Sequence, residues 1–263
     1  MIAKTGGLFI SLLDYLGELG LLVSKITESL VHGKPRWRLM IRQVAEIGYR
    51  SQPVVIVTGA FTGAVLAAQA LFQFRPLGLE SGAGALVSVA MLRELGPSIT
   101  ALMLAGRVGA SMAAEIGTMK VTEQIDALRS MGVHPIDYLV TPRLIAMLVA
   151  MPLLIAESAA FGIISSFLVG TTGPAGVNPA YWMDQVHQYT ELDDIVIALT
   201  KGLVFGILIV IISCHQGLSV TRGAVGVGLG TTRAMVFSAL ALLIFNFFLT
   251  LLLNMIFPAG FSS

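Results

Sequence analysis

Residues 195–214 read IVIALTKGLVFGILIVIISC and contain one charged side chain, Lys201. The hydrocarbon core of a bilayer needs about 20 apolar residues of α-helix, because no water is available there to satisfy backbone amides. The stretch has this length and composition, and it therefore predicts a membrane-spanning helix. The whole chain agrees with that prediction. Of its 263 residues, 56% are hydrophobic and 12% are charged, whereas about a quarter of the residues of a soluble domain are charged.

Four further stretches have the length and composition of membrane spans. They cover residues 53–74, 85–114, 144–170 and 234–257. The second of them is the least regular, because Arg93, Glu94 and Pro97 interrupt it. The sequence thus predicts an all-α integral membrane protein with five transmembrane helices.

The amino-terminal segment has the pattern of an amphipathic helix rather than of a signal peptide. Asp14 and Glu18 interrupt the early apolar stretch, and no small-residue cleavage site follows it. Apolar side chains recur at helical spacing opposite polar ones; they are Leu8, Leu12, Leu16, Leu19, Val23, Ile26 and Leu30. We expect residues 1–50 to form an interfacial amphipathic helix with a basic cytoplasmic linker, and residues 51–263 to form the membrane domain. An ordinary helix packed against other protein is the alternative.

The basic residues predict the orientation of the chain, since Lys and Arg accumulate in short cytoplasmic loops. Twelve of the sixteen lie before the first span, between the second and third, or between the fourth and fifth. The opposite loops contain only Arg75, and residues 171–194 contain none. We therefore expect a cytoplasmic amino end and an external carboxyl end.

Small residues recur at four-residue spacing within the spans. Such pairs let helix backbones approach closely in lipid; they include Gly59 with Gly63, Gly106 with Ala110, Gly109 with Ala113, Ser158 with Gly162, and Gly202 with Gly206. They are compatible with a dimeric bundle and equally with close packing inside one chain.

The loop between the second and third spans predicts a short cytoplasmic helix over about residues 118–131, ended by Gly132 and Pro135. Its apolar residues fall on one side and its charged residues on the other. Such a helix could lie in a groove of a soluble partner or be an ordinary solvated surface helix.

Ionisable side chains inside spans are costly and are usually paired or exposed to a polar cavity. Here they are Arg93, Glu94, Arg107, Glu157 and Lys201. We expect Glu94 and Lys201 to neutralise each other, with Asn246 as a neutral hydrogen-bonding neighbour. The pair could shape the mouth of a cavity or serve only as a structural ion pair.

Several classes of function find no support in the residues. The formal net charge of +1 gives no reason to expect nucleic-acid binding, and the single cysteine, Cys214, cannot form an intrachain disulfide. No HExxH or CxxC metal motif occurs, and the spacing of Ser111 and His215 does not make a protease site. The glycine-rich run at 223–230 lacks the Gly-Lys-Ser/Thr ending of a nucleotide-binding loop. We therefore expect a non-enzymatic chain without a metal or cofactor of its own, so that any ATP and Mg²⁺ would be bound by another chain.

Two blocks of sequence resemble the MlaE/YrbE-type permeases of the MCE-associated ABC lipid transport systems. The first runs from LRELGPSIT at 92–100 through AGRVGAS at 105–111 to PRL at 142–144. The second runs from GAVGVG at 223–228 through TTR at 231–233 to FLT at 248–250. With the order and length of the spans, the resemblance covers most of the chain from Val54 onward and identifies residues 51–263 as an MlaE-type permease domain.

This resemblance implies a multi-pass permease of the bacterial inner membrane that acts as a homodimer. A cytosolic ABC ATPase would energise it, a periplasmic MCE-domain protein would exchange phospholipid with it for outer-membrane lipid homeostasis, and in some systems a STAS-domain protein joins the ATPase. The helix at 118–131 would then be the coupling helix. Its expected ATPase-coupling residues are Glu115, Thr118, Met119, Thr122, Glu123, Asp126 and Arg129.

The resemblance also implies a phospholipid pocket at the dimer interface. Residues expected to face it are Leu66, Gln69, Phe74, Glu94 and Leu95, with Lys201 at the basic position of the fourth span. The family often has Asp where this chain has Asn246, so Lys201 should pair with Glu94 or Glu157. The main alternative is an ion-coupled secondary transporter that uses Glu94 and Lys201, although such proteins usually contain an internal repeat and none is found. A structural scaffold is the third possibility.

Overall fold

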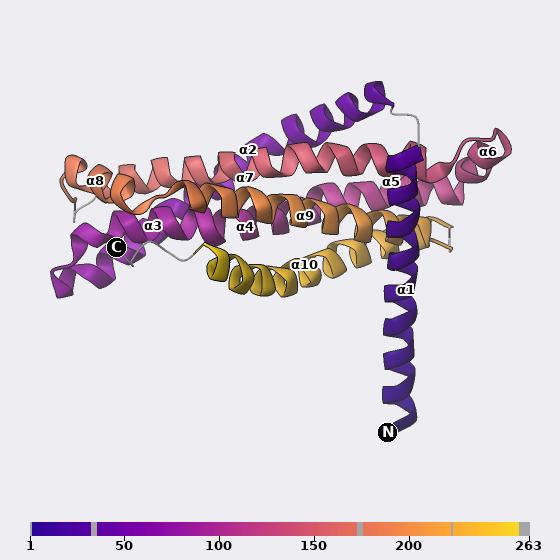
Figure 1. The fold of residues 1–263 in the computed structure, drawn as a ribbon, viewed down its shortest axis with the longest axis horizontal. Coiled ribbons are helices and arrows are strands. Elements are labelled where there is room, and N and C mark those ends of the chain that lie inside the picture. The colour runs from indigo at the N-terminus through magenta and orange to yellow at the C-terminus, as the bar shows by residue number, and fades with distance from the viewer. Residues whose placement is uncertain (1, 33–35, 173–175, 222, 258–263) are drawn as a thin grey trace. The chain divides into compact units, whose positions relative to one another are not determined.

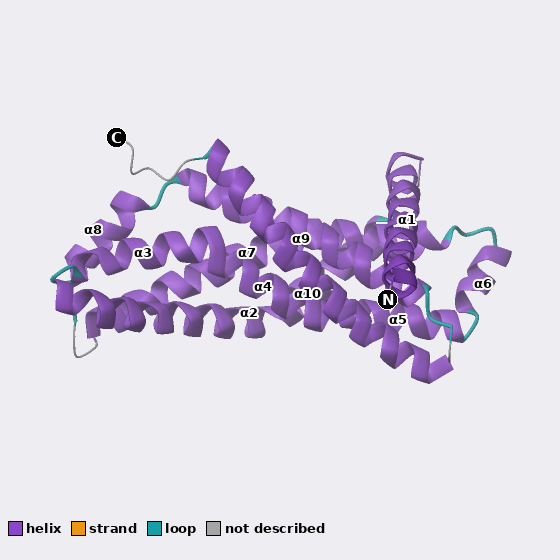
Figure 2. Ribbon diagram, turned by 90° about the horizontal axis from the view of Figure 1, so that it is seen from below, coloured by secondary structure: helices purple, strands orange, loops and turns teal. Residues whose placement is uncertain are grey.

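The computed structural model describes residues 2–32, 36–172, 176–221 and 223–257, and every regular element in these ranges is a helix (Figures 1 and 2). The α-helices are α1 (Ile2–His32), α2 (Trp37–Phe74), α3 (Ala83–Ala90), α4 (Gly96–Leu104), α5 (Ala110–Val121), α6 (Gln124–Ser130), α7 (Thr141–Thr172), α8 (Pro179–Tyr189), α9 (Leu192–Leu218) and α10 (Gly223–Ile256). The 3₁₀ turns are η1 (Arg75–Leu77) and η2 (Glu80–Gly82), and the π-helical segments are η3 (Met91–Leu95), η4 (Ala105–Gly109) and η5 (Ile136–Val140). The all-α prediction is confirmed. Lys34 and Arg222, which contribute to the orientation prediction, lie outside the described residues.

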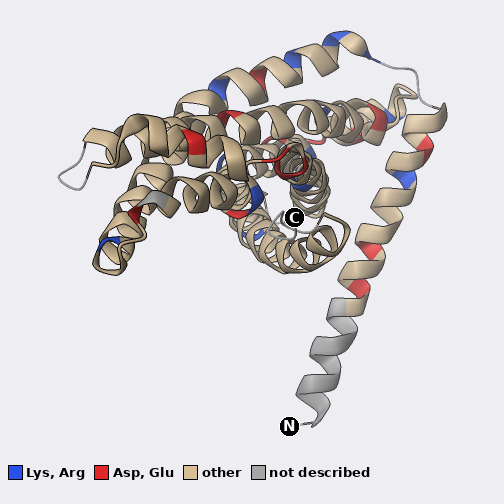
Figure 3. Ribbon diagram, turned by 60° about the vertical axis from the view of Figure 1, so that its left-hand side comes forward, with Lys and Arg blue, Asp and Glu red and all other residues tan. Residues whose placement is uncertain are grey.

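Five stretches of the described chain are long and apolar enough to span a membrane, as predicted. They are Trp37–Leu77, Ala83–Val121, Ile136–Thr172, Leu192–Leu218 and Gly223–Ile256. Charged residues are sparse along them, and most of each ribbon is tan in Figure 3. The second stretch is irregular as expected, because η3 and η4 interrupt its α-helical turns.

The observed spans are longer than the predicted ones. The first was expected to begin at residue 53, yet α2 begins at Trp37, so most of the expected basic linker is helical. Residues 37–47 contain no glycine or proline to end a helix. The last was expected to begin at residue 234, yet α10 begins at Gly223 and includes the glycine-rich run. In that run Gly230 serves close packing, since a Cβ there would lie 3.0 Å from a methyl group of Val220.

The expected helix over residues 118–131 is wrong in its bounds, because two helices share this segment. α5 ends at Val121, and α6 begins at Gln124. Between them Glu123 adopts a left-handed conformation with φ 58°, which an uninterrupted helix does not allow. Helix α8, in the loop after the third span, was not predicted.

The contacts divide the chain into two compact units. Unit 1 comprises Met1–Val44, Ala105–Ala146 and Ile207–Ser238, and unit 2 comprises Ala45–Leu104, Met147–Gly206 and Ala239–Ser263. Each unit has its own buried residues.

In unit 2 the small residues allow α2, α7 and α9 to pack closely. A Cβ at Gly63 would overlap the backbone of Gly162, and a Cβ at Gly59 would lie 2.7 Å from the Ser158 hydroxyl. On the other side of α7, a Cβ at Gly202 would lie 3.0 Å from the Cα of Pro152. These small residues therefore serve packing within one chain, which was one of the two readings of their spacing.

Trp182 of α8 fills an apolar core of unit 2. It is fully buried in a cluster with Ala67, Leu71, Val87 and other apolar residues. There is room for its ring because residue 170 is glycine, where a Cβ would lie 2.6 Å from the ring edge. The result is that α8 is held against α3 and the end of α7.

In unit 1, α1 contacts residues far along the chain. Glu18 pairs with His215 at 2.9 Å, and the Tyr15 ring meets the His215 ring edge-on at 5.2 Å between centroids. Burial raises the pKa of the Tyr15 phenol, an effect that the hydrogen bond from Gln216 opposes and nearby Glu18 reinforces. The helical conformation of this segment is confirmed; its amphipathic character and its position in the headgroup plane stay predictions.

Candidate functional site

A π-helical turn places two adjacent charges inside the second span. In η3 the amide of Gly96 donates to the carbonyl of Met91, five residues back. Residue 97 is proline, so the carbonyl of Arg93 lacks the amide donor that an α-helix would provide. A buried carbonyl without a donor is costly. This local sequence therefore creates an acceptor for another group at residue 93.

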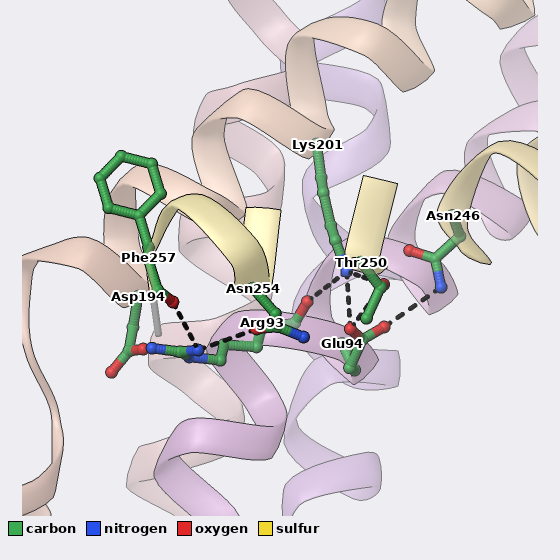
Figure 4. A network of polar contacts seen from close by, with 8 residues as sticks. All are labelled: Arg93, Glu94, Asp194, Lys201, Asn246, Thr250, Asn254 and Phe257. Carbon is green, nitrogen blue, oxygen red and sulfur yellow. Dashed lines mark hydrogen bonds and ion pairs between the residues drawn. The ribbon is translucent and has the colours of Figure 1, made fainter. Parts of the chain in front are cut away.

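Lys201 of α9 provides that group. Its ammonium is fully buried and donates to the Arg93 carbonyl at 2.7 Å, to Glu94 Oε1 at 2.8 Å and to Thr250 Oγ1 at 2.9 Å (Figure 4). An ammonium has three donors, and all three are used. The buried charge is thus both neutralised and fully hydrogen-bonded.

Glu94 is the centre of this network. Its Oε1 accepts from Lys201 and, at 2.8 Å, from the Thr250 hydroxyl, while its Oε2 accepts from Asn246 Nδ2 at 3.1 Å. The predicted contacts of Glu94 with Lys201 and Asn246 are confirmed, and Glu157 is not the partner of Lys201. The Glu94 side chain stays 37% exposed, so one edge of the network remains accessible from outside this chain.

Arg93 extends from the same turn to a second set of partners. Its guanidinium pairs with Asp194 at the start of α9, and it donates to Asn254 Oδ1 at 3.0 Å and to the Phe257 carbonyl at 3.3 Å. Sequence reasoning missed Asp194, because this residue belongs to the 171–194 loop and precedes the predicted span at 195–214. Arg93 inside a span requires an acidic or carbonyl partner, but this rule does not identify the residue that provides it.

The polar residues of α10 form one line along the helix. Asn246, Thr250 and Asn254 are four residues apart and therefore share a face. Each of them bonds to Glu94, Lys201 or Arg93. The neighbouring side chains of α10 are mostly exposed and apolar, and the polar line attaches the helix to η3 and α9.

Three of the expected pocket residues lie around one apolar cluster. Leu66, Phe74 and Leu95 are half-buried and pack against the cluster that contains Trp182. Gln69 is exposed on α2 and does not belong to that cluster. The structure thus brings together the apolar members of the predicted set, and it places Glu94 next to Leu95 on η3.

The expected coupling residues lie on α5, on α6 and in the turn between them. Thr118, Glu123, Asp126 and Arg129 are exposed, whereas Met119 is half-buried. Asp126 and Arg129 pair with each other at 3.0 Å. Thr122 is exposed and its hydroxyl donates to the carbonyl of Thr118. Ile125, in contrast to these exposed residues, is fully buried and anchors α6.

Glu115 differs from the other expected coupling residues. Its carboxylate accepts from Arg143 Nη2 at 2.7 Å, and Arg143 also donates to the Leu139 carbonyl at 2.6 Å. This ion pair joins α5 to the first turn of α7. The pair thus joins the two ends of the segment, residues 116–142, that contains α6.

Comparison with known proteins decides the family. The model of the family described as Permease MlaE matches residues 40–252. The chain belongs to the MlaE permease family. With its five apolar helices, this MlaE permease is a multi-pass membrane protein, of the inner membrane in bacteria.

Named relatives of this MlaE permease come from bacteria and a plant. A "Probable ABC transporter permease protein" of Rickettsia typhi is 45% identical over 215 residues, which are 82% of this chain and 83% of the relative. The "Intermembrane phospholipid transport system permease protein MlaE" of Haemophilus influenzae is 33% identical over 83% of this chain and 85% of its own. "Protein TRIGALACTOSYLDIACYLGLYCEROL 1, chloroplastic" of Arabidopsis thaliana is 39% identical over 88% of this chain and 65% of its own.

Proposed function

We propose that this chain is the permease subunit of an ABC transporter that moves phospholipids between the inner membrane and a periplasmic MCE-domain protein, for outer-membrane lipid homeostasis. The observation that carries the proposal is the 33% identity, over 83% of the chain, to a protein named as an intermembrane phospholipid transport permease. ATP would be hydrolysed by a separate cytosolic ATPase, to which a STAS-domain protein binds in some systems. Two copies of the permease would form a homodimer.

The lipid would lie against the apolar residues near η3. Leu66, Phe74 and Leu95 offer half-buried apolar surface for acyl chains, and the exposed amide of Gln69 lies on the same helix as Leu66 and Phe74. The accessible edge of Glu94, with Asn246 beside it, offers polar contacts for a headgroup. Lys201 is fully buried with all its donors used, so its role would be to hold Glu94 in place rather than to touch lipid.

The ATPase would bind the charged side of α6 and the turn before it. Glu123, Asp126 and Arg129 are exposed there, and Ile125 anchors the helix to the permease. Glu115, which pairs with Arg143, would keep the end of α5 fixed against the start of α7. Movement of the ATPase would thereby be transmitted to α5 and α7.

Purification with the ATPase tests this proposal. The double variant Glu123→Lys with Asp126→Lys should lose the co-purifying ATPase, while native mass spectrometry should still report a homodimer with bound phospholipid. A matched control reverses two exposed acids elsewhere, Asp184→Lys with Glu191→Lys, and should retain the ATPase. If the wild-type protein carries neither phospholipid nor ATPase, the proposed function is wrong.

The alternative of an ion-coupled secondary transporter depends on Glu94 and Lys201 acting as exchangeable charges. The family assignment does not favour it, and the fully bonded Lys201 leaves no free donor for an ion-coupled step. The alternative expects an ion gradient alone to drive transport in liposomes that contain only this chain. Our proposal expects no transport there until the ATPase and ATP are added.

A further inference from the structure

The first turns of α2 carry an exposed patch of basic and large apolar side chains. This basic-aromatic patch consists of Trp37, Arg38, Ile41 and Arg42, all of them exposed (Figure 3). Trp37 and Ile41 are 68% and 67% exposed. The positions are three or four residues apart and therefore lie on one side of the helix. Met40, on the other side, is buried, so this part of α2 packs on protein along one side only.

The charges of the two arginines in the patch are not neutralised within the chain. Residues 36–45 contain no Asp or Glu, and the next acid, Glu46, pairs with Arg50 at 2.8 Å. Among the residues that the structure describes, no carboxylate lies within ion-pair distance of Arg38 or Arg42. The patch therefore presents two uncompensated positive charges.

Contacts within unit 1 hold the start of α2 in place. The Arg36 guanidinium stacks on the ring of Tyr138 in η5, with 4.9 Å between its Cζ and the ring centroid. Such a cation is attracted to the face of the ring. The Arg36 carbonyl also accepts from the amides of Leu39 and Met40, at 2.9 and 3.1 Å. The patch thus lies on an ordered helix, and a ligand does not have to order the backbone when it binds.

The length of α2 brings the patch to a membrane surface. The helix has 38 residues, and at 1.5 Å per residue it is about 57 Å long, whereas the hydrocarbon core of a bilayer is about 30 Å thick. The apolar residues 53–74 suffice to cross this core, so the first turns extend beyond it. Pro53, inside the helix, has no amide hydrogen and permits a bend, through which these turns can lie against the lipid headgroups.

The residue types of the patch match the chemistry of a headgroup layer. The Trp37 ring has an apolar body and a polar N–H, a combination that favours the membrane interface. Ile41 gains by leaving water for the boundary of the acyl chains. Guanidinium groups form paired, charge-assisted hydrogen bonds with phosphate oxygens. Two unpaired arginines favour a headgroup with a net negative charge, because a zwitterionic headgroup brings its own cation.

We propose that the basic-aromatic patch binds the headgroup of an anionic phospholipid and retains this lipid beside the start of α2. The patch belongs to unit 1, whereas the expected pocket residues Leu66, Phe74 and Leu95 belong to unit 2. The lipid on the patch is therefore a resident ligand rather than cargo. The inference does not depend on which molecule the permease transports.

Trp37 itself reports which lipid lies beside the patch. The chain contains two tryptophans, and the other, Trp182, is fully buried. The Trp37→Phe protein gives the Trp182 signal, which is subtracted. The full chain is placed in nanodiscs that contain brominated phosphatidylglycerol in unlabelled phosphatidylcholine, or brominated phosphatidylcholine in unlabelled phosphatidylglycerol, at the same mole fraction. We expect stronger quenching of Trp37 by the brominated anionic lipid, with a preference of about fivefold for each arginine.

Substitutions and salt decide whether the two arginines cause this preference. Arg38→Gln with Arg42→Gln should lower it at least tenfold. Arg50→Gln removes an exposed arginine of the same helix that is already paired with Glu46, and should leave it unchanged. Unchanged melting of each variant shows that folding is intact, and high salt should lower the preference of the unsubstituted protein by screening.

Three results overturn the proposal. The first is equal quenching of Trp37 by the two brominated lipids in the unsubstituted protein. The second is a preference that survives the double substitution, or that falls as far in Arg50→Gln. The third is the absence of quenching by either lipid, which is expected if the patch faces water or an acidic surface of a soluble protein.

Discussion

At the scale of single residues, Lys201 is the side chain on which the polar network most depends. Replacing it by methionine keeps the length of the side chain but removes the cationic partner of the Glu94 carboxylate and the side-chain donor to the Arg93 carbonyl. Loss of one partner of a buried pair costs about 3–5 kcal/mol, and the partial exposure of Glu94 favours the lower end. We expect Lys201→Met to lower the free energy of unfolding by about 3 kcal/mol, measured as reduced thermal stability in detergent.

A second substitution separates charge imbalance from loss of packing. Adding Glu94→Gln to Lys201→Met removes both charges, so at least half of the lost stability should return. The exposed pair of Arg50 with Glu46, at 2.8 Å, gives the matched control, and Arg50→Met should cost less than about 0.5 kcal/mol. Equal melting of Lys201→Met and wild type would contradict the account of the network.

The residues of the network could be predicted only in part. Ionisable side chains in spans need partners, and this rule alone pairs Glu94 with Lys201. The pairing of Arg93 with Asp194 could not be derived in the same way, because α9 begins at Leu192, before the apolar run that marks it in the sequence. Pro97 is visible in the sequence, but hydropathy does not reveal the π-helical turn that precedes it.

At the scale of elements, the end of α6 depends on one glycine. Gly132 has φ 74°, and its amide and that of Val133 donate back to Arg129 and Leu128 to cap the helix. A β-branched side chain in this conformation costs about 1–2 kcal/mol. We expect Gly132→Val to distort the end of α6 and to reduce the co-purifying ATPase severalfold.

A glycine in open space provides the control for that substitution. Gly228 lies within α10, and a Cβ there would meet no atom within 4 Å. Gly228→Val should leave ATPase co-purification unchanged. If both variants retain the ATPase equally, the geometry of α6 does not govern the association.

The elements show why spans are predicted more reliably than their ends. All five apolar stretches form helices. The thickness of the bilayer requires about 20 apolar residues per spanning helix, and a hydropathy pattern detects stretches of that length. Polar turns that continue a helix beyond the apolar region, such as the start of α2 at Trp37, carry no such signal. The break at Glu123 was missed for a related reason: a non-glycine residue in a left-handed conformation has no reliable mark in the sequence.

At the scale of the whole molecule, the orientation in the membrane is the prediction on which the coupling proposal depends. Lys and Arg near the ends of spans are retained in the cytoplasm, and this rule predicts that α6 lies inside the cell and α8 outside it. Ser130 and Gln188 are exposed residues on these two helices, and the native Cys214 is buried, so single cysteines can report the side of each. A membrane-impermeant maleimide should label Gln188→Cys in intact spheroplasts, and Ser130→Cys only after the membrane is permeabilised. The opposite labelling would place α6 beyond the reach of any cytosolic ATPase, whereas the pairing of Glu94 with Lys201, which lies within one chain, would be unaffected.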